Sequence, residues 1–148
     1  MRASIIPLLL PFFLAGCHTI ETPVNFVQVE RGDLGGYHVR AMSADGVVVG
    51  LRTQDNPKRG TLEFWSAAMQ NELTGRGYRL VKAEDIRGAS GQLGRLMEFA
   101  TDQRGTGFTY LLATYVTDST VLLAEAGGKT EAVDKYRPRI RQSLLTAR

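Results

Sequence analysis

Few side chains in this sequence have the type and spacing that covalent, metal or acid–base chemistry requires. The chain has one cysteine, Cys17, and two histidines, His18 and His38. A nucleophilic triad would need His38 near a serine and an acid, yet the sequence holds no G-x-S-x-G elbow. The adjacent acids Glu84 and Asp85 are expected at a strand end, and neighbours on a strand face opposite sides, so they do not form a natural acid–base pair. We therefore predict that the protein is not an enzyme.

A second pattern that could bind a ligand is Gly128-Lys129-Thr130, placed between an expected strand and an expected helix. A phosphate-binding loop of the G-x-x-x-x-G-K-[ST] type needs a glycine at position 123, where this chain has leucine. Two interpretations stay open for this segment. It is either a helix start with Thr130 as the N-cap, or a weak anion site at the helix N-terminus.

The N-terminal segment gives Cys17 a specific chemistry. Arg2 precedes an apolar run over Ile5–Leu14, and Leu14-Ala15-Gly16-Cys17 follows at its end. A charged start, an apolar stretch and small residues at the end are typical of a secretory signal. The four residues are similar to the lipobox of bacterial lipoproteins. The resemblance implies cleavage before Cys17, a diacylglycerol on its sulfur and an acyl chain such as palmitate on the freed amine.

Three alternatives for this segment are an ordinary cleaved signal, a transmembrane anchor and a buried helix. The apolar run is about half the roughly 20 residues that cross a bilayer. Pro7 and Pro11 lie within it, and each would remove a backbone donor from a buried helix. The lipoprotein interpretation is therefore preferred. An acylated Cys17 is also unable to form a metal cluster with the histidines, so we expect no metal and no cofactor.

The residue after the cysteine bears on localisation. In many lipoproteins of the enteric type an aspartate at this position retains the protein at the inner membrane, whereas this chain has His18. By resemblance to that sorting rule, we expect the periplasmic face of the outer membrane.

The expected organisation is a signal peptide over residues 1–16, a lipidated tether over 17–25 and one domain over 26–148. The domain has the length and the ordinary apolar content that a single core requires. Its charge is uneven, because residues 129–148 hold six basic and two acidic side chains. Such a basic helix either meets anionic headgroups or an acidic partner, or is simply a solvated face. No nucleic-acid partner is expected.

The pattern of the domain indicates an α+β fold. Asp45-Gly46 joins two β-rich runs, 37–42 and 47–53, as a hairpin. From Thr61 the apolar residues recur at helical spacing, and Gly75 and Gly77 end that helix. Further strands are expected over 78–84, 93–101, 107–117 and 120–126, and a last helix from about residue 130.

Large apolar side chains on both faces of the run 108–116 predict a strand covered on both sides. With two long helices in the chain, we predict an antiparallel sheet of about six strands with one helix packed on each face. The stripe of the first helix is Leu62, Trp65, Met69 and Leu73, and that of the last is Val133, Tyr136, Ile140 and Leu144.

The order of these elements resembles the PsbP-like fold, which includes the extrinsic photosystem II protein and envelope lipoproteins of the DcrB type. The similarity rests on a hairpin, a helix bearing Trp65 that ends at Gly77-Tyr78, a strand meander, the run 121–128 and a C-terminal helix. It covers residues 26–147 and implies a non-catalytic accessory that docks on other envelope components.

Two functions are weighed on this basis. The first is an envelope lipoprotein, attached to the membrane through Cys17, that docks on another envelope protein or on the cell-wall layer. The second is a periplasmic module that binds a small apolar or amphiphilic ligand between sheet and helix. An exposed apolar patch would favour the first, and an apolar cavity the second. The residues proposed for a partner surface are Phe64, Arg137, Arg139 and Arg141.

Overall fold

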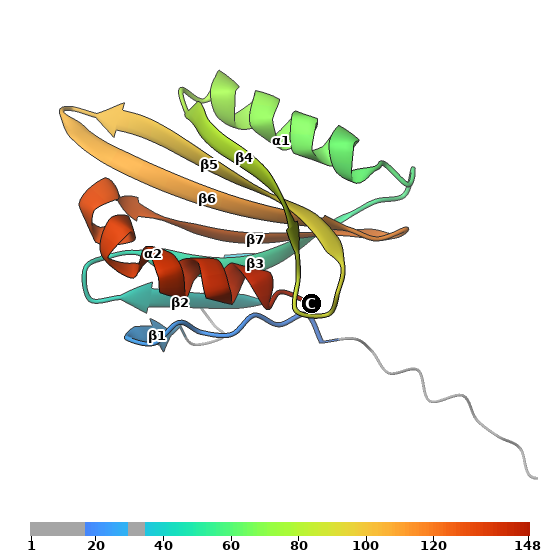
Figure 1. Ribbon diagram of the computed structural model, residues 1–148, viewed down its shortest axis with the longest axis horizontal. Coiled ribbons are helices and arrows are strands. Elements are labelled where there is room, and N and C mark those ends of the chain that lie inside the picture. Colours follow the sequence, from blue (N-terminus) through green and yellow to red (C-terminus); the bar gives the residue numbers. More distant parts are fainter. Residues whose placement is uncertain (1–16, 30–34) are drawn as a thin grey trace, which may run out of the picture.

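The chain folds as one curved antiparallel sheet with two helices (Figure 1). The computed structural model describes residues 17–29 and 35–148, so the signal peptide proposed for residues 1–16 lies outside the described residues. The elements are β1 (Phe26–Gln28), β2 (Val39–Ser43), β3 (Val48–Asp55), α1 (Leu62–Gly75), β4 (Arg79–Arg87), β5 (Leu93–Gln103), β6 (Thr106–Val116), β7 (Thr120–Lys129) and α2 (Thr130–Leu145).

The seven strands lie in the order β1-β2-β3-β7-β6-β5-β4, and every neighbouring pair is antiparallel. The strands β4 to β7 form a meander, and β7 then pairs with β3, which places the N-terminal hairpin at the other side of the sheet. The prediction of an α+β fold with an antiparallel sheet is confirmed. The strand number was too low by one, because β1 is only three residues long and has no alternation to detect.

Alternate residues of β6 belong to two separate apolar clusters. Leu111 and Tyr115 pack in the cluster that contains the buried stripe of α2, whereas Leu112 packs in the cluster that contains Met69 of α1. Tyr115 is fully buried, and its hydroxyl donates to the carbonyl oxygen of Leu144 over 3.0 Å. Alternation along an extended strand sends these side chains to opposite faces of the sheet. The double-sided burial expected for this run is therefore confirmed.

The two helices differ in how deeply they are buried. The four stripe residues expected on α2 are all buried, whereas Leu62, Trp65 and Leu73 of α1 are only half-buried. Within the α1 stripe, Met69 is fully covered. The reason is position: α1 lies over the outer part of the sheet, against β4, β5 and β6, and leaves the β3 side of that face without a helix (Figure 1).

Local signals explain the helix ends. The hydroxyl of Thr61 accepts a hydrogen bond from the amide of Phe64, as expected of an N-cap, and Gly77 adopts a φ of 88° after the last turn. Helix α2 follows β7 without a loop, and the Lys129 side chain makes no cap bond. Thr130 is not the N-cap that the sequence suggested. Its hydroxyl instead lies 3.0 Å from that of Thr109.

The β2–β3 hairpin is fastened to α2 by its turn. Asp45 accepts hydrogen bonds from Lys135 at 2.8 Å and from the hydroxyl of Tyr136 at 2.6 Å. These two donors, the lysine first, hold the pKa of the Asp45 carboxyl below its usual value. Gly46 adopts a φ of 79°, in agreement with the Asp-Gly turn that the sequence predicts.

Residues 18–25 differ from the free tether that their composition suggests, because they lie along α2 and the C-terminal residues. The amide of Thr19 donates to the carbonyl of Arg148 over 2.8 Å, and the amide of Arg148 donates back to Thr19 over 3.1 Å. Glu21 receives a hydrogen bond from Ser143 and donates its amide to Thr146. Ile20 is buried in the α2 cluster. This packing could not be predicted from the sequence. One buried isoleucine gives no repeating apolar pattern, and the backbone hydrogen bonds connect residues that are far apart in the chain.

Candidate functional site

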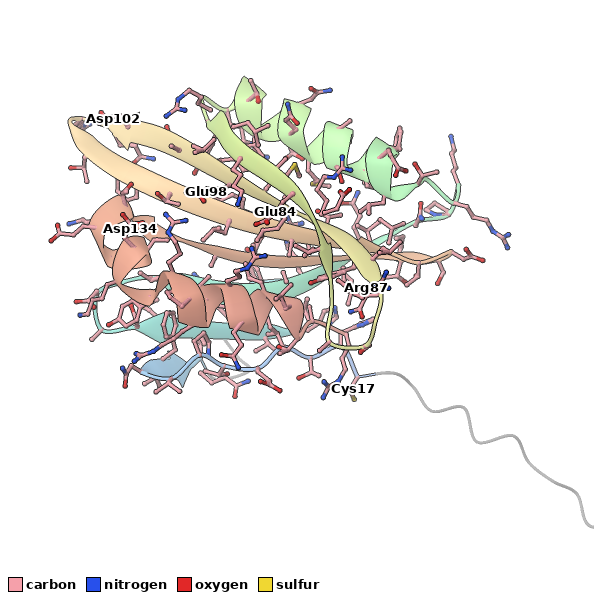
Figure 2. The ribbon with its side chains drawn as sticks, in the orientation of Figure 1. Cys17, Glu84, Arg87, Glu98, Asp102 and Asp134 are labelled. Carbon is pink, nitrogen blue, oxygen red and sulfur yellow. The ribbon has the colours of Figure 1, made fainter. Side chains whose placement is uncertain are left out.

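The N-terminal end of the described chain places Cys17 in the open. Cys17 is an exposed free thiol, and Figure 2 shows it beside the C-terminal end of α2. Only His18 separates it from Thr19, which is bonded to Arg148. An acyl group on this sulfur would therefore start directly at the surface of the folded domain.

The two histidines lie together beside this cysteine. The rings of His18 and His38 are 5.1 Å apart between centroids, and Nε2 of His38 lies 2.8 Å from the hydroxyl of Thr53. His38 is exposed and lies just before Val39, at the start of β2. Among residues 17–29 and 35–148, no three His, Cys, Asp or Glu side chains group as metal ligands would.

A second surface lies where β3 leads into α1. Gln54, Asp55, Pro57, Lys58, Phe64 and Trp65 line an open hollow of about 560 Å³ there. Phe64 is 60% exposed, and its ring meets that of Trp65 edge-on with 5.6 Å between centroids. Phe64, one of the residues proposed for a partner surface, therefore faces solvent.

Asn56 holds this surface in shape. It is only 2% exposed, and its amide group donates to the carbonyls of Gly60 at 3.0 Å and Thr117 at 2.9 Å. Its side-chain oxygen accepts from the amide of Gly60 at 2.7 Å and from Nε1 of Trp65 at 3.0 Å. Both donors and both acceptor positions of the side chain are used, which fixes the loop against the start of α1. The role of Asn56 in fixing the loop was not predicted from the sequence. The available signal was the Asn-Pro pair before a helix, which is a known turn signal.

The basic face of α2 is largely neutralised by the sheet. Arg137 pairs with Glu98 of β5 at 2.7 Å, and Arg141 pairs with Glu84 of β4 at 2.6 Å. These partners point from the strands toward α2 in Figure 2, and together with Lys82 they line a hollow of about 310 Å³. The Arg141 guanidinium lowers the pKa of the Glu84 carboxyl. Arginines that the sequence offered as a partner surface thus bind acids of their own chain.

Arg139 is the third of these arginines and points elsewhere. It is exposed beside residues 21–24, and no salt bridge joins it to another described residue. The structure therefore does not bring Phe64 and the three arginines into one patch: Phe64 lies at the α1 surface, and the arginines lie along α2 on the other face.

A polar cluster that the sequence analysis did not single out lies on the part of the sheet that α1 leaves open. Glu125 of β7 is 5% exposed, and its two carboxylate oxygens accept hydrogen bonds from the hydroxyls of Tyr37 and Tyr110. Nε of Arg52 lies 3.3 Å from the same carboxylate. Three donors from three segments thus surround one buried charge, as a buried carboxylate requires.

Two glycines make room for the tyrosine rings of this cluster. An added Cβ at Gly50 would lie 2.7 Å from the ring of Tyr37, and one at Gly127 would lie 3.2 Å from the ring of Tyr110. Gly127 stands directly opposite Tyr110 in the β6–β7 register. The rings therefore lie flat over the sheet with their hydroxyls directed at Glu125.

The electrostatics of the cluster keep both phenols protonated. Burial, with the bond to Glu125 as a second cause, raises the pKa of Tyr37 to about 12. Burial and the Glu125 charge raise the pKa of Tyr110 well above its ordinary value. Chemically the arrangement is a satisfied ion pair and hydrogen-bond network that joins β3, β6, β7 and the segment before β2. The signal in the sequence was a charged residue inside the apolar run 121–126.

Within the described residues, no helix has both the length and the apolar character needed to span a membrane.

Comparison with known proteins identifies the fold. No family model and no curated protein sequence matches the chain. Several solved structures are similar in fold. One is LpqN of Mycobacterium tuberculosis, a protein involved in cell envelope biogenesis, which superposes with a TM-score of 0.67 at 10% identity. The superposition covers 88% of this chain and 81% of LpqN. The cyanobacterial PsbP of Synechocystis superposes with a TM-score of 0.58 at 12% identity, over 89% and 86% of the two chains. PA94 of Pseudomonas aeruginosa, a protein of unknown function, gives 0.51 at 15% identity, over 88% and 96%.

These likenesses define the class of fold. The chain has a PsbP-like α+β fold, as the order of its elements indicated. At identities of 10–15% the superposition describes architecture, and function must be argued from the surfaces of this chain.

Proposed function

We propose that this protein is a non-catalytic lipoprotein of the bacterial cell envelope that serves as an accessory or docking module for another envelope component. The observation that carries the proposal is the lipobox-like Leu14-Ala15-Gly16-Cys17, which ends at a cysteine exposed at the surface of the domain. The chain is similar in fold to LpqN, a protein involved in cell envelope biogenesis, and this similarity agrees with such a role.

The polar clusters of the described residues support a binding role over a catalytic one. Glu125 is buried, and its carboxylate oxygens accept hydrogen bonds from Tyr37, Tyr110 and Arg52. The acids beside α2 are likewise paired with arginines. A general base needs a lone pair that is directed at the substrate. These carboxylates instead bind tyrosine hydroxyls and arginine side chains of the same protein.

The rival function, binding of an apolar or amphiphilic ligand between sheet and helix, has less support. The hollow between α2 and the sheet is lined by charged side chains, among them Lys82, Glu98 and Arg137. On the other face, Met69, Phe99 and Leu112 fill the contact between α1 and the sheet. Neither arrangement offers the predominantly apolar, pre-formed pocket that such ligands occupy.

For the protein partner, the outward side of α2 around Arg139 is the preferred surface, because Arg137 and Arg141 are already paired. For localisation, we place the protein on the periplasmic face of the outer membrane, following the residue after Cys17, which is His18.

Expression of Cys17→Ala beside the unaltered chain in a Gram-negative host tests the lipoprotein proposal. The unaltered protein is expected in the membrane fraction with an intact mass that includes the acyl chains, and Cys17→Ala as an unprocessed or soluble form. A Cys17→Ala protein that stays membrane-bound at the mature mass would contradict the proposal. His18→Asp serves as the matched control: it should keep the lipid mass but move the protein toward inner-membrane fractions on a sucrose gradient.

A further inference from the structure

The distance between the lipid and the folded domain is very short. Thr19 is attached to the folded domain, because its amide and its carbonyl are both hydrogen-bonded to Arg148. The next residue, Ile20, is buried. The Cα atoms of Cys17 and Thr19 are at most about 7 Å apart, whatever conformation His18 takes. A diacylglycerol on Cys17 therefore cannot hold the domain away from the bilayer.

We infer that the end of the domain around Cys17 lies directly on the lipid surface, and that Phe64 enters the headgroup layer there. The inference rests on the proposed lipidation and adds which surface faces the membrane. It reassigns Phe64 from a protein-docking residue to a membrane contact.

Cys17 and the Phe64 surface lie on opposite faces of the sheet, and the end of β3 lies between them. The ring of His18 lies beside that of His38 in a tilted arrangement, and Nε2 of His38 lies within hydrogen-bond distance of the Thr53 hydroxyl near the end of β3. Gln54, the next residue, already lines the hollow that Phe64 and Trp65 complete. In Figure 1 the start of α1, the β6–β7 turn and the beginning of the described chain all lie at the right-hand end of the molecule. A flat bilayer surface can touch them together.

The chemistry of this end suits the interface between headgroups and acyl chains. Phe64 is an exposed aromatic ring, supported from below by Trp65, whose indole N–H is bonded to Asn56. Phenylalanine and tryptophan are common on the apolar face of protein segments that lie in the membrane interface. Lys58 and Arg59 are exposed in the adjoining loop, while Asp55 and Asp118 lie close by. Because both signs are present, we expect the contact to depend on Phe64 and the acyl chains more than on anionic lipid.

The single tryptophan of the sequence makes the inference measurable. The lipidated protein is reconstituted in phosphatidylcholine vesicles whose acyl chains are either plain or brominated near the glycerol. Bromine quenches only nearby indoles, so Trp65 emission should fall on the brominated vesicles. Phe64→Ser should reduce this loss, since the ring that draws the surface into the interface is gone. Val27→Ser is the matched control: Val27 is 76% exposed on β1, toward the other end of the domain, and should leave the quenching unchanged.

A linker variant gives the sharpest comparison. About twelve Gly/Ser residues between His18 and Thr19 would add roughly 20 Å of flexible reach. This variant should keep the acyl mass and float with the vesicles, yet lose the quenching of Trp65.

The outcomes separate the two proposals. A protein without acyl mass would defeat the lipoprotein proposal, and the inference with it. A protein that carries the acyl mass, floats with vesicles and shows equal Trp65 emission on plain and brominated lipid would leave the lipoprotein proposal standing and overturn the inference. So would a Phe64→Ser variant that quenches like the unaltered chain but loses a cross-linked envelope protein, because Phe64 would then belong to a protein interface.

Discussion

Nε1 of Trp65 donates a hydrogen bond to the side-chain oxygen of Asn56 over 3.0 Å, which links the first turn of α1 to the loop before it. Asn56 is nine residues earlier in the chain and is more completely buried than the tryptophan it holds. This hydrogen bond holds Trp65 in place, and the ring of Phe64 packs edge-on against that of Trp65. The bond therefore also helps to orient the exposed ring of Phe64.

Replacement of Asn56 by alanine should cost about 1–3 kcal/mol of unfolding free energy, because buried partners such as the Gly60 and Thr117 carbonyls and the Trp65 indole are left unpaired. Urea unfolding monitored by far-UV circular dichroism measures the loss, and Trp65 emission should shift to the red. Gln54→Ala, at an exposed position in the same segment, is the control. Equal stabilities for the two variants would contradict the assigned role.

The raised pKa of the Tyr37 hydroxyl predicts how the unfolding free energy changes at alkaline pH. Its pKa is raised to about 12 in the folded protein, against an ordinary value of about 10. The unfolded chain releases this proton first, so the stabilisation is complete below pH 10 and is lost as the pH rises through 12. Unfolding free energies measured from pH 9 to 12 should fall less steeply in Tyr37→Phe than in the unaltered chain. Parallel slopes would show that Tyr37 does not contribute.

The glycine beneath the same ring gives an independent test. In Gly50→Ala the new Cβ would lie 2.7 Å from the Tyr37 ring and 3.3 Å from the Val39 carbonyl oxygen, so the ring or the strand backbone must shift. Such overpacking costs about 1–3 kcal/mol. Gly127→Ala, with its nearest contact at 3.2 Å, should cost less.

Combining Gly50→Ala with Tyr37→Leu separates the ring clash from other effects. If the clash is the cause, the double variant should lose less stability than the sum of the two single variants. Additive losses in urea unfolding would instead point to the backbone of β3.

The arginines of α2 should differ in their response to charge reversal. Arg141→Glu faces Glu84 across 2.6 Å in the native pair, so it should destabilise the protein by up to about 1 kcal/mol. Arg139→Glu should be nearly neutral. The double exchange Arg141→Glu with Glu84→Arg should restore part of the loss, as measured by thermal melts at low salt. A neutral Arg141→Glu would show that solvent screens the pair completely.

The parts of the fold that could be predicted are those whose periodicity is local. The run 108–116 carries apolar groups on both faces, and α2 has a regular stripe, so each indicated its own burial. Helix α1 has the same spacing but covers only the outer strands, and no local pattern reports how far a helix extends over a sheet. Strand β1 is too short for alternation to appear.

The Glu125 cluster was beyond sequence reasoning for a different reason. Tyr37 and Arg52 are 88 and 73 residues away from Glu125 in the chain. The β3–β7 pairing brings Arg52 to Glu125, and the β2–β3 pairing brings Tyr37. A glutamate inside an apolar strand indicates that partners must exist without naming them. Arg137 and Arg141 illustrate the same limit, since their acidic partners lie on β5 and β4.

The exchange of hydrogen bonds between Thr19 and Arg148 also fixes an order of events. These bonds join Thr19 to Arg148, so they cannot form until residue 148 has been synthesised and is available for folding. Closing a loop of this length is slow compared with forming the hairpins of the β4–β7 meander. Until Arg148 is in place, the residues that follow Cys17 therefore lack these two hydrogen bonds to the C-terminal residues. An enzyme that acts on Cys17 before this step would meet the cysteine without the backbone bonds that join Thr19 to Arg148.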